Sequence, residues 1–367
     1  MANSMPTLLQ QVVEMYQQQP DIKKMGFLTS LFKVTPESFT DVNKIGMDMV
    51  YGGNDIAPVV RNLSTGAVII TIDKFGNMEV PFPVYSLETP VDITQLMDRF
   101  PGESAFVKGA TINWYGRMAT KIKEGINKHL RMIKGAMEYQ AAQVLTTGKC
   151  TLTDEDGNEI NELDYKIPAN HFPEVTVPWE NPSAKPIDNL NMLDDVIRSD
   201  GQVDVVNYIM GKNVWRNFLN NEQVQKNLDK NILNTLEISP QMRDKGAAYL
   251  GKLNTDGHVR LFWGYDATYT PWKQPDITSY YIDPDKVIFL PALEAMDFRR
   301  YFGGIPNIKL DPVFDPLFGN KITVEGEYDF KIRVWFDEDA ETYKGRTRSR
   351  PLFVPASRLR LGCLYTG

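Results

Sequence analysis

A helical pattern of unusual length lies in residues 111–149. Apolar side chains return along it every three or four positions, at Ile112, Tyr115, Met118, Ala119, Ile122, Ile126, Leu130, Ile133, Met137, Ala141, Val144 and Leu145. This spacing places them on one face of a helix. Thr111 can cap the first turn, Gly148 can end the last one, and no proline interrupts the segment. We therefore predict a helix over 111–147, longer than most helices of globular proteins.

The polar face of this predicted helix is basic. It carries Arg117, Lys121, Lys123, Lys128, Arg131 and Lys134, with Glu124 as the single acid among them. Three interpretations stay open: a core helix with a solvated face, a structural spine, or a surface that meets a polyanion.

The first residues combine a short helix with a strongly apolar segment. Residues 7–19 predict the helix, and residues 26–34 form the apolar segment. Leu28, Leu31 and Phe32 would be costly to leave in water. Because no long predicted element lies beside them, we expect them to pack on another part of the fold or on another subunit.

One hairpin is predicted before the long helix in the sequence and a second one after it. A strand over 40–51 is followed by two arms, 67–72 and 78–84, which we expect to pair around a turn at 74–77. Prolines in the second arm confine it to an edge or an extension, and the simplest alternative is an ordinary hairpin packed in its own chain. After the helix, residues 149–153 and 159–166 flank an acidic turn. The acids lack the glycine spacing of a calcium loop, so we predict no ion site there.

The rest of the chain alternates short helices and strands after a proline-rich connector. The connector is 168–186, the helices are 187–199, 213–220 and 224–231, and the strands are 203–210, 247–250, 258–265, 278–290, 327–336, 352–354 and 359–365. Together with the hairpins, this mixture predicts an α+β fold.

Charge is distributed unevenly along the 367 residues. The net charge is −7, which argues against a general nucleic-acid binder, yet 111–149 and 331–367 are basic and 150–189 is acidic. Lys344, Arg346, Arg348 and Arg350 form a basic cluster. The cluster could contact DNA, pair with the acidic segment 154–164 of the same or a neighbouring subunit, or be solvated; we favour pairing.

Candidate chemistry is sparse. His129, His171 and His258 are isolated from one another and from the cysteines, so the sequence predicts neither a metal site nor a catalytic site, and it has no phosphate-binding glycine motif. Cys150 and Cys363 do not form a disulfide framework, which favours a reducing compartment. We find no secretory signal and no apolar stretch long enough to cross a membrane.

Several short segments, in this order, carry a family resemblance. They are Val-Leu-Thr-Thr-Gly-Lys at 144–149, Tyr-Ile-Met-Gly-Lys-Asn-Val-Trp at 208–215, Val-Gln-Lys-Asn-Leu-Asp at 224–229, Gly-Tyr at 264–265, Tyr-Tyr-Ile-Asp-Pro-Asp-Lys-Val at 280–287 and Ser-Arg-Pro-Leu-Phe-Val-Pro at 349–355. With the apolar arm, the hairpin arm and the long helix before them, they resemble the lambda capsid-protein E family of tailed-phage major capsid proteins.

The resemblance implies an α+β fold of the Hong Kong 97 type. Its expected parts are an N-terminal arm over 1–53, an extended E-loop hairpin region over 54–107, a P-domain over 108–186 with the spine helix 111–147 and its hairpin, an axial A-domain over 187–317, and a return to the P-domain with the C-terminal strands over 318–367. No motif for covalent cross-linking of subunits transfers to this chain.

The resemblance also implies a structural role without catalysis, cofactor or metal. The chain would self-assemble into hexamers and pentamers of an icosahedral head that encloses double-stranded DNA without sequence specificity. Portal, scaffold and decoration proteins are further partners of such heads; a membrane is not. The product would be a virion capsid assembled in the host cytoplasm. The candidate inter-subunit contacts are Leu28, Leu31, Phe32, Lys344, Arg346, Arg348 and Arg350.

Three alternatives stand beside this interpretation. An encapsulin-like compartment shell has the same fold but encloses a protein cargo. An enzyme whose site leaves no motif would show a cleft of titratable groups with shifted pKa values. A nucleic-acid-binding module that uses the basic helix would lose DNA affinity steeply with salt.

Overall fold

The longest described helix is α4 (Trp114–Thr147), and several sheets pack along it. The computed structural model describes residues 26–40, 44–50, 75–92, 94, 114–154, 156–229, 236–238, 246–255, 258–305, 330–340 and 342–367. The 34 residues of α4 confirm the predicted helix, and its expected cap at Thr111 lies outside the described residues. Gly148 ends α4 in the left-handed region, with φ 67° and its N–H donating to the Val144 carbonyl.

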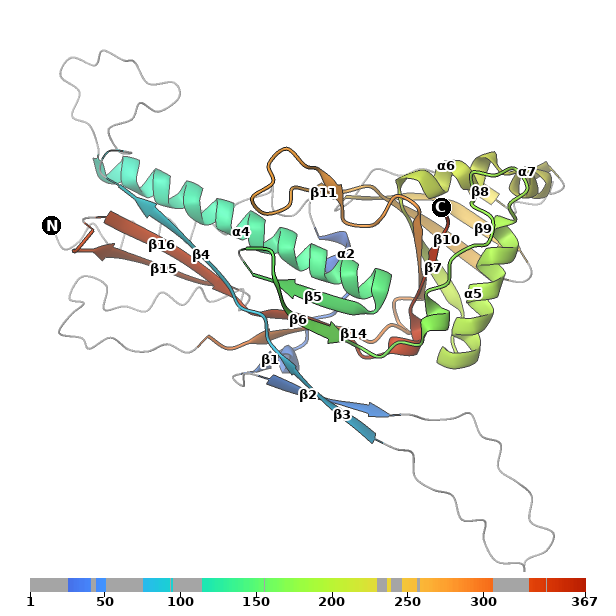
Figure 1. Ribbon diagram of the computed structural model, residues 1–367, viewed down its shortest axis with the longest axis horizontal. Helices are drawn as coiled ribbons and strands as arrows, with labels where there is room; N and C mark the ends of the chain where they lie inside the picture. Colours follow the sequence, from blue (N-terminus) through green and yellow to red (C-terminus); the bar gives the residue numbers. More distant parts are fainter. Residues whose placement is uncertain are drawn as a thin grey trace, which may run out of the picture.

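The apolar stripe of α4 is buried along its described length. Its most enclosed members are Ile122, Ile126, Leu130, Ile133, Met137, Ala141, Val144 and Leu145, each no more than 2% exposed. Figure 1 shows α4 running through the elongated part of the molecule, with strands on both sides. The periodicity in the sequence therefore marks a core that extends along α4 from Met118 to Leu145.

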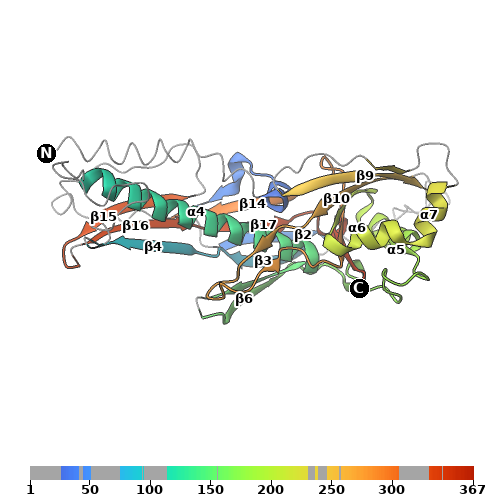
Figure 2. The same ribbon diagram turned by 90° about the horizontal axis from the view of Figure 1, so that it is seen from above.

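Two three-stranded sheets and a hairpin pack along α4. One sheet has the order β15 (Lys331–Asp337), β16 (Thr342–Ser349), β4 (Tyr85–Val91), and the second has the order β1 (Phe39–Thr40), β14 (Phe298–Gly303), β17 (Pro351–Pro355). The hairpin of β5 (Lys149–Thr153) and β6 (Glu159–Asp164) follows α4 directly. Figures 1 and 2 place the β15–β16–β4 sheet along the first half of α4 and the hairpin near its end.

A six-stranded sheet lies beyond the end of α4. Its order is β18 (Gly362–Tyr365), β13 (Lys286–Pro291), β7 (Val205–Met210), β10 (His258–Tyr265), β9 (Ala247–Thr255), β8 (Leu236–Ile238). The helices α5 (Pro186–Gly201), α6 (Lys212–Asn220) and α7 (Glu222–Asp229) group at this end of the molecule (Figure 2).

The two faces of the six-stranded sheet belong to two different cores. Ile209, Ile288 and Cys363 point toward the core of α4, whereas their neighbours in sequence, such as Tyr208 and Phe289, join the core beneath α5 and α6. This is the alternation expected of strands that are buried on both sides. The sheet therefore connects the spine to the helical end of the molecule.

One predicted hairpin is wrong. The residues expected to form its turn, Phe75–Asn77, lie within β3 (Phe75–Pro81), which pairs antiparallel with β2 (Lys44–Val50). Gly76 and Asn77 of the expected turn are extended here, opposite Met49 and Asp48. β3 ends at Pro81, as expected for a residue that cannot donate to a ladder. The arm 67–72 lies outside the described residues.

Most other predicted elements are confirmed within a few residues. The hairpin after α4, the helices α5, α6 and α7 and the strands β7, β10 and β13 lie where the sequence predicted them. The helix over 7–19 lies outside the described residues. The expected domain limit after residue 317 separates strands that share sheets, because β14 pairs with β17 and β18 pairs with β13.

Candidate inter-subunit surfaces

The basic cluster of the sequence lies mainly on strand β16, and two of its cations pair with acids of the same sheet. Lys344 forms an ion pair with Asp337, and Arg346 forms one with Glu88. Lys344 lowers the pKa of the Asp337 carboxyl below its ordinary value by donating a hydrogen bond to it. The expected intrachain partner, the acidic segment 154–164, is therefore replaced by acids of β4 and β15.

This correction has a simple cause. β4 is polar and was not predicted as a strand, yet it pairs with β16 so that Glu88 lies directly opposite Arg346. In the acidic hairpin, Asp156 instead contacts Lys273, with 3.1 Å between the carboxylate oxygen and the ammonium nitrogen.

Arg350 differs from the other three cations because it is buried. Its side chain is 8% exposed, and its guanidinium donates to the Gly304 carbonyl at 2.6 Å and lies over the Phe82 ring. Burial lowers the pKa of Arg350. Arg350 therefore belongs to the packing of its own chain and not to an accessible surface.

The remaining cations share one side of the β15–β16–β4 sheet. Gly345 faces α4, since a Cβ atom built there would lie 3.8 Å from Ile122 and from Ile126. Successive side chains of a strand point to opposite sides. Lys344 and Arg346, the neighbours of Gly345 in sequence, therefore point away from α4.

Strand β15 adds two cations and an aromatic ring to that side. Lys331 lies directly opposite Arg348, and Arg333 lies directly opposite Arg346. The guanidinium carbons of Arg333 and Arg346 lie 5.3 and 4.9 Å from the centre of the Trp335 ring. We call this side the basic face: Lys331, Arg333, Lys344, Arg346 and Arg348 around Trp335.

The three apolar candidates of the N-terminal arm are buried within their own chain. Leu28, Leu31 and Phe32 are 0%, 9% and 2% exposed, and the Phe32 ring meets Phe353 edge to face at 5.1 Å. Their need for burial, which motivated the inter-subunit prediction, is thus met without a second subunit. An inter-subunit contact by these residues stays a prediction.

One buried carboxylate holds this arm in place. Glu138 of α4 is 2% exposed and accepts hydrogen bonds from the backbone N–H groups of Leu28 and Thr29, at 2.8 and 2.9 Å. It also accepts from the Thr29 hydroxyl and from the Tyr265 hydroxyl of β10, the latter at 2.7 Å. Glu138 therefore joins the arm, the spine helix and the six-stranded sheet.

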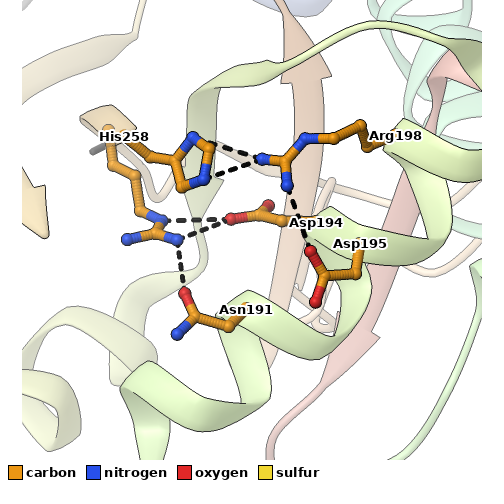
Figure 3. A pocket seen from close by; sticks show the side chains of 6 residues that line it. Asn191, Asp194, Asp195, Arg198 and His258 are labelled. Atoms are coloured by element: carbon orange, nitrogen blue, oxygen red, sulfur yellow. Dashed lines mark hydrogen bonds and ion pairs between the residues drawn. The ribbon is translucent and has the colours of Figure 1, made fainter. Parts of the chain in front are cut away.

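A polar cavity of about 150 Å³ lies between α5 and β10 (Figure 3). Arg260 and Asp194 form a buried ion pair there, with 2.8 Å between nitrogen and oxygen, and Tyr208 donates its hydroxyl to Asp194. Burial raises the pKa of the Asp194 carboxyl, although Tyr208 and Arg260 oppose the shift. Arg198 donates to the His258 ring. Each of these groups already has a partner in the chain, which is typical of a structural network.

The other candidate chemical groups are also engaged in packing. His129 lies between the hydroxyls of Thr89 and Thr347, at 2.7 and 3.3 Å. Cys150 and Cys363 are each 3% exposed, and burial raises the pKa of both thiols to about 12. Among the described residues, no three His, Cys, Asp or Glu side chains gather as a metal would require. No helix in the described part of the chain is long and apolar enough to cross a membrane.

Comparison with known proteins agrees with this architecture. The model of the family described as phage major capsid protein E matches residues 10–359. The chain belongs to the phage major capsid protein E family. No curated protein matches it.

Several solved structures of low sequence identity are similar to this chain. A putative capsid protein of a prophage from Escherichia coli CFT073 is 18% identical over 80% of each chain, with a TM-score of 0.56. A phage-related protein from Bordetella bronchiseptica RB50 is 12% identical over 98% of this chain and 96% of its own, with a TM-score of 0.49. The SrpI encapsulin of Synechococcus elongatus PCC 7942 is 8% identical over 95% and 89%, with a TM-score of 0.47. The family match and the prophage capsid structure show that the capsid protein has the Hong Kong 97-like fold that the family resemblance implied.

Proposed function

We propose that this capsid protein self-assembles through hexamers and pentamers into an icosahedral head that encloses double-stranded DNA. The family match over residues 10–359 carries the proposal. DNA would be enclosed without sequence-specific contacts, and assembly in the host cytoplasm would precede release of the virion. Portal, scaffold and decoration proteins are the further partners that we propose.

The two-stranded ribbon of β2 and β3 supports assembly through neighbouring subunits. A two-stranded ribbon is marginally stable alone in water, and in the described residues β2 and β3 pair only with each other. It projects from the body of the molecule in Figure 1. A neighbouring subunit that covers the ribbon would supply the missing contacts. We propose that it belongs to the arm and E-loop regions expected over 1–53 and 54–107.

The proposed division into an N-terminal arm, E-loop, P-domain and A-domain follows the same logic. The spine helix with its sheets forms the P-domain, and most of the six-stranded sheet with α5, α6 and α7 forms the A-domain. The charged network between α5 and β10 supports a structural role for the A-domain, because its members are engaged with one another.

Electron microscopy of the overexpressed protein tests the proposal. We expect closed icosahedral shells with six-fold and five-fold capsomers. Rings or small discrete oligomers under every assembly condition would contradict it. Co-expression with packaging components should then yield shells that contain nuclease-protected DNA, whereas shells that retain a specific protein cargo and no DNA would favour the encapsulin-like alternative.

A further inference from the structure

On the residues that the structure describes, the basic face places like charges directly opposite one another and carries more cations than carboxylates. Lys331 opposite Arg348 and Arg333 opposite Arg346 are two successive pairs of like charge across β15 and β16. Like charges directly opposite each other destabilise an antiparallel pair. Five cations share this face with two carboxylates, those of Glu88 and Asp337, so an excess of three positive charges remains on its described residues. An anionic partner would remove the repulsion.

The β5–β6 hairpin has the opposite character. The described residues of 149–166 contain the acids Asp154, Asp156, Glu159, Glu162 and Asp164 against Lys149 and Lys166, an excess of three negative charges. Ile160 projects from β6 with 69% of its side chain exposed, and Glu159 beside it is exposed as well. An exposed apolar side chain among acids is a suitable counterpart for an aromatic ring among cations.

We propose that the basic face of one capsid subunit binds the β5–β6 hairpin of a second copy of this chain. The inference rests on the proposed shell assembly and names one of its interfaces. Within one subunit the two surfaces lie along different halves of α4 in both views (Figures 1 and 2). The ion pairs of their described residues do not join one surface to the other: Arg346 pairs with Glu88, Lys149 with Glu162 and Asp156 with Lys273. Binding between copies would place Ile160 near Trp335 and the acids of the hairpin near Arg333 and Arg348.

A protein partner fits the basic face better than a phosphate backbone does. Glu88 and Asp337 lie on the same face and would repel phosphates. The hairpin instead carries Lys149 and Lys166, which pair with Glu162 and Asp164 within one subunit. On binding, these lysines can exchange their partners for the two carboxylates while the acids of the hairpin meet the cations. Charges of both signs on each surface fix the position of one subunit relative to the next. A closed shell requires the same relative position at every copy of the interface.

Disulfide trapping in assembled particles tests the contact directly. A chain with Ile160→Cys is co-assembled with a differently tagged chain carrying Arg333→Cys, and the particles are oxidised and analysed on a non-reducing gel. We expect a mixed-tag dimer that requires assembly. The native Cys150 and Cys363 are buried and should not interfere. The control pairs Ile160→Cys with Val259→Cys, an exposed position on β10. Intact shells with no more dimer than the control would overturn the proposal while leaving shell formation established.

Charge exchange gives a second, independent test. Arg333→Glu with Arg348→Glu should lower the assembly yield about tenfold at low salt, and Glu159→Lys with Glu162→Lys should do the same. All four changes in one chain should restore assembly, because the acids introduced on the basic face would then meet the lysines introduced on the hairpin. Lys185→Glu with Lys226→Glu, which changes the net charge equally on α7 and beside α5, should assemble normally. Face variants that form normal shells but lose packaged DNA would replace the hairpin with DNA as the partner.

Discussion

Replacing Glu138 should release the N-terminal arm before it unfolds the protein. The buried carboxylate accepts four hydrogen bonds, and two of the donors, the Leu28 N–H and the Tyr265 hydroxyl, are themselves buried. A buried donor left without a partner costs about 1–3 kcal/mol. Glu138→Ala should therefore lower the free energy of unfolding by about 2–6 kcal/mol.

Glu138→Gln is the more informative variant because it keeps the volume of the side chain. It removes the negative charge and turns one acceptor oxygen into an amide that faces donors. We expect a loss of about 2 kcal/mol or more, concentrated where Leu28 and Thr29 are held. Hydrogen exchange measured by mass spectrometry should show faster exchange in the peptide 26–32 at denaturant concentrations where the six-stranded sheet is still protected.

Gln140 provides a matched control two residues further along α4. It is also 2% exposed, and its amide donates to the Tyr85 hydroxyl at 2.5 Å, in the β15–β16–β4 sheet. Gln140→Leu should reduce stability without accelerating exchange in 26–32. If Glu138→Gln left exchange of that peptide at the wild-type rate, the assignment of Glu138 as the anchor of the arm would be wrong.

Four further predictions concern the spine, the thiols, a close approach and pH. Ile126→Pro should kink α4 at a cost of about 3 kcal/mol or more and give insoluble or assembly-deficient protein, measured by soluble yield and microscopy. Cys150 and Cys363 should both react with a thiol reagent in denatured, unreduced protein, and neither should react in the folded protein. Gly211→Ala should cost about 1–3 kcal/mol, measured by denaturant unfolding, because its Cβ would lie 2.4 Å from the Asp283 carbonyl oxygen. Burial and nearby Lys128 lower the pKa of His129 below its ordinary 6.5. The stability contributed by the neutral histidine is therefore present above about pH 6.5, and it is lost as the pH falls through the lower pKa that His129 has in the folded protein. His129→Gln should make the free energy of unfolding less dependent on pH in this range.

Each of these has a clear contrary result. Wild-type shell yield from Ile126→Pro would remove the structural role of the spine helix. Rapid labelling of the folded protein would show that the thiols are accessible, and fewer than two thiols after denaturation would mean that a disulfide exists. Unchanged stability of Gly211→Ala, or equal pH dependence with and without His129, would show that those contacts are looser than described.

The spine helix was predictable because its apolar residues repeat with the period of a helix, and α4 buries that stripe from Met118 to Leu145. Strand β16 was not, since only Tyr343 on its core-facing side is a large hydrophobic residue, and the others are the small or polar Gly345, Thr347 and Ser349. Small side chains on this side leave room for α4. They also mean that the sequence of β16 lacks the alternation of apolar and polar residues by which a strand is usually recognised.

The anchor of the arm could not be recognised for a different reason. In the sequence Glu138 resembles any acid on a helix surface, and its burial depends on Leu28 and Tyr265, which are distant in the chain. The pairing of β2 with β3 is similarly long-range, and the prediction instead paired two neighbouring segments around a local turn at 74–77. Local sequence patterns therefore identified most helices and strands. The way these helices and strands pack, and which charged groups become buried, depends on contacts between segments that are distant in the chain.

The position of β18 has a consequence for folding during synthesis. β13 lies between β7 and β18, so a nascent chain that has produced β13 but not residues 362–365 presents the apolar strand β13 as an open edge. The same holds for β14, whose antiparallel partner β17 is made from residues 351–355. Exposed strand edges invite pairing with other chains. On a polysome, where many copies grow side by side, both sheets close only after residues beyond 350 emerge, which delays completion of the subunit fold until nearly all of this sequence has been synthesised.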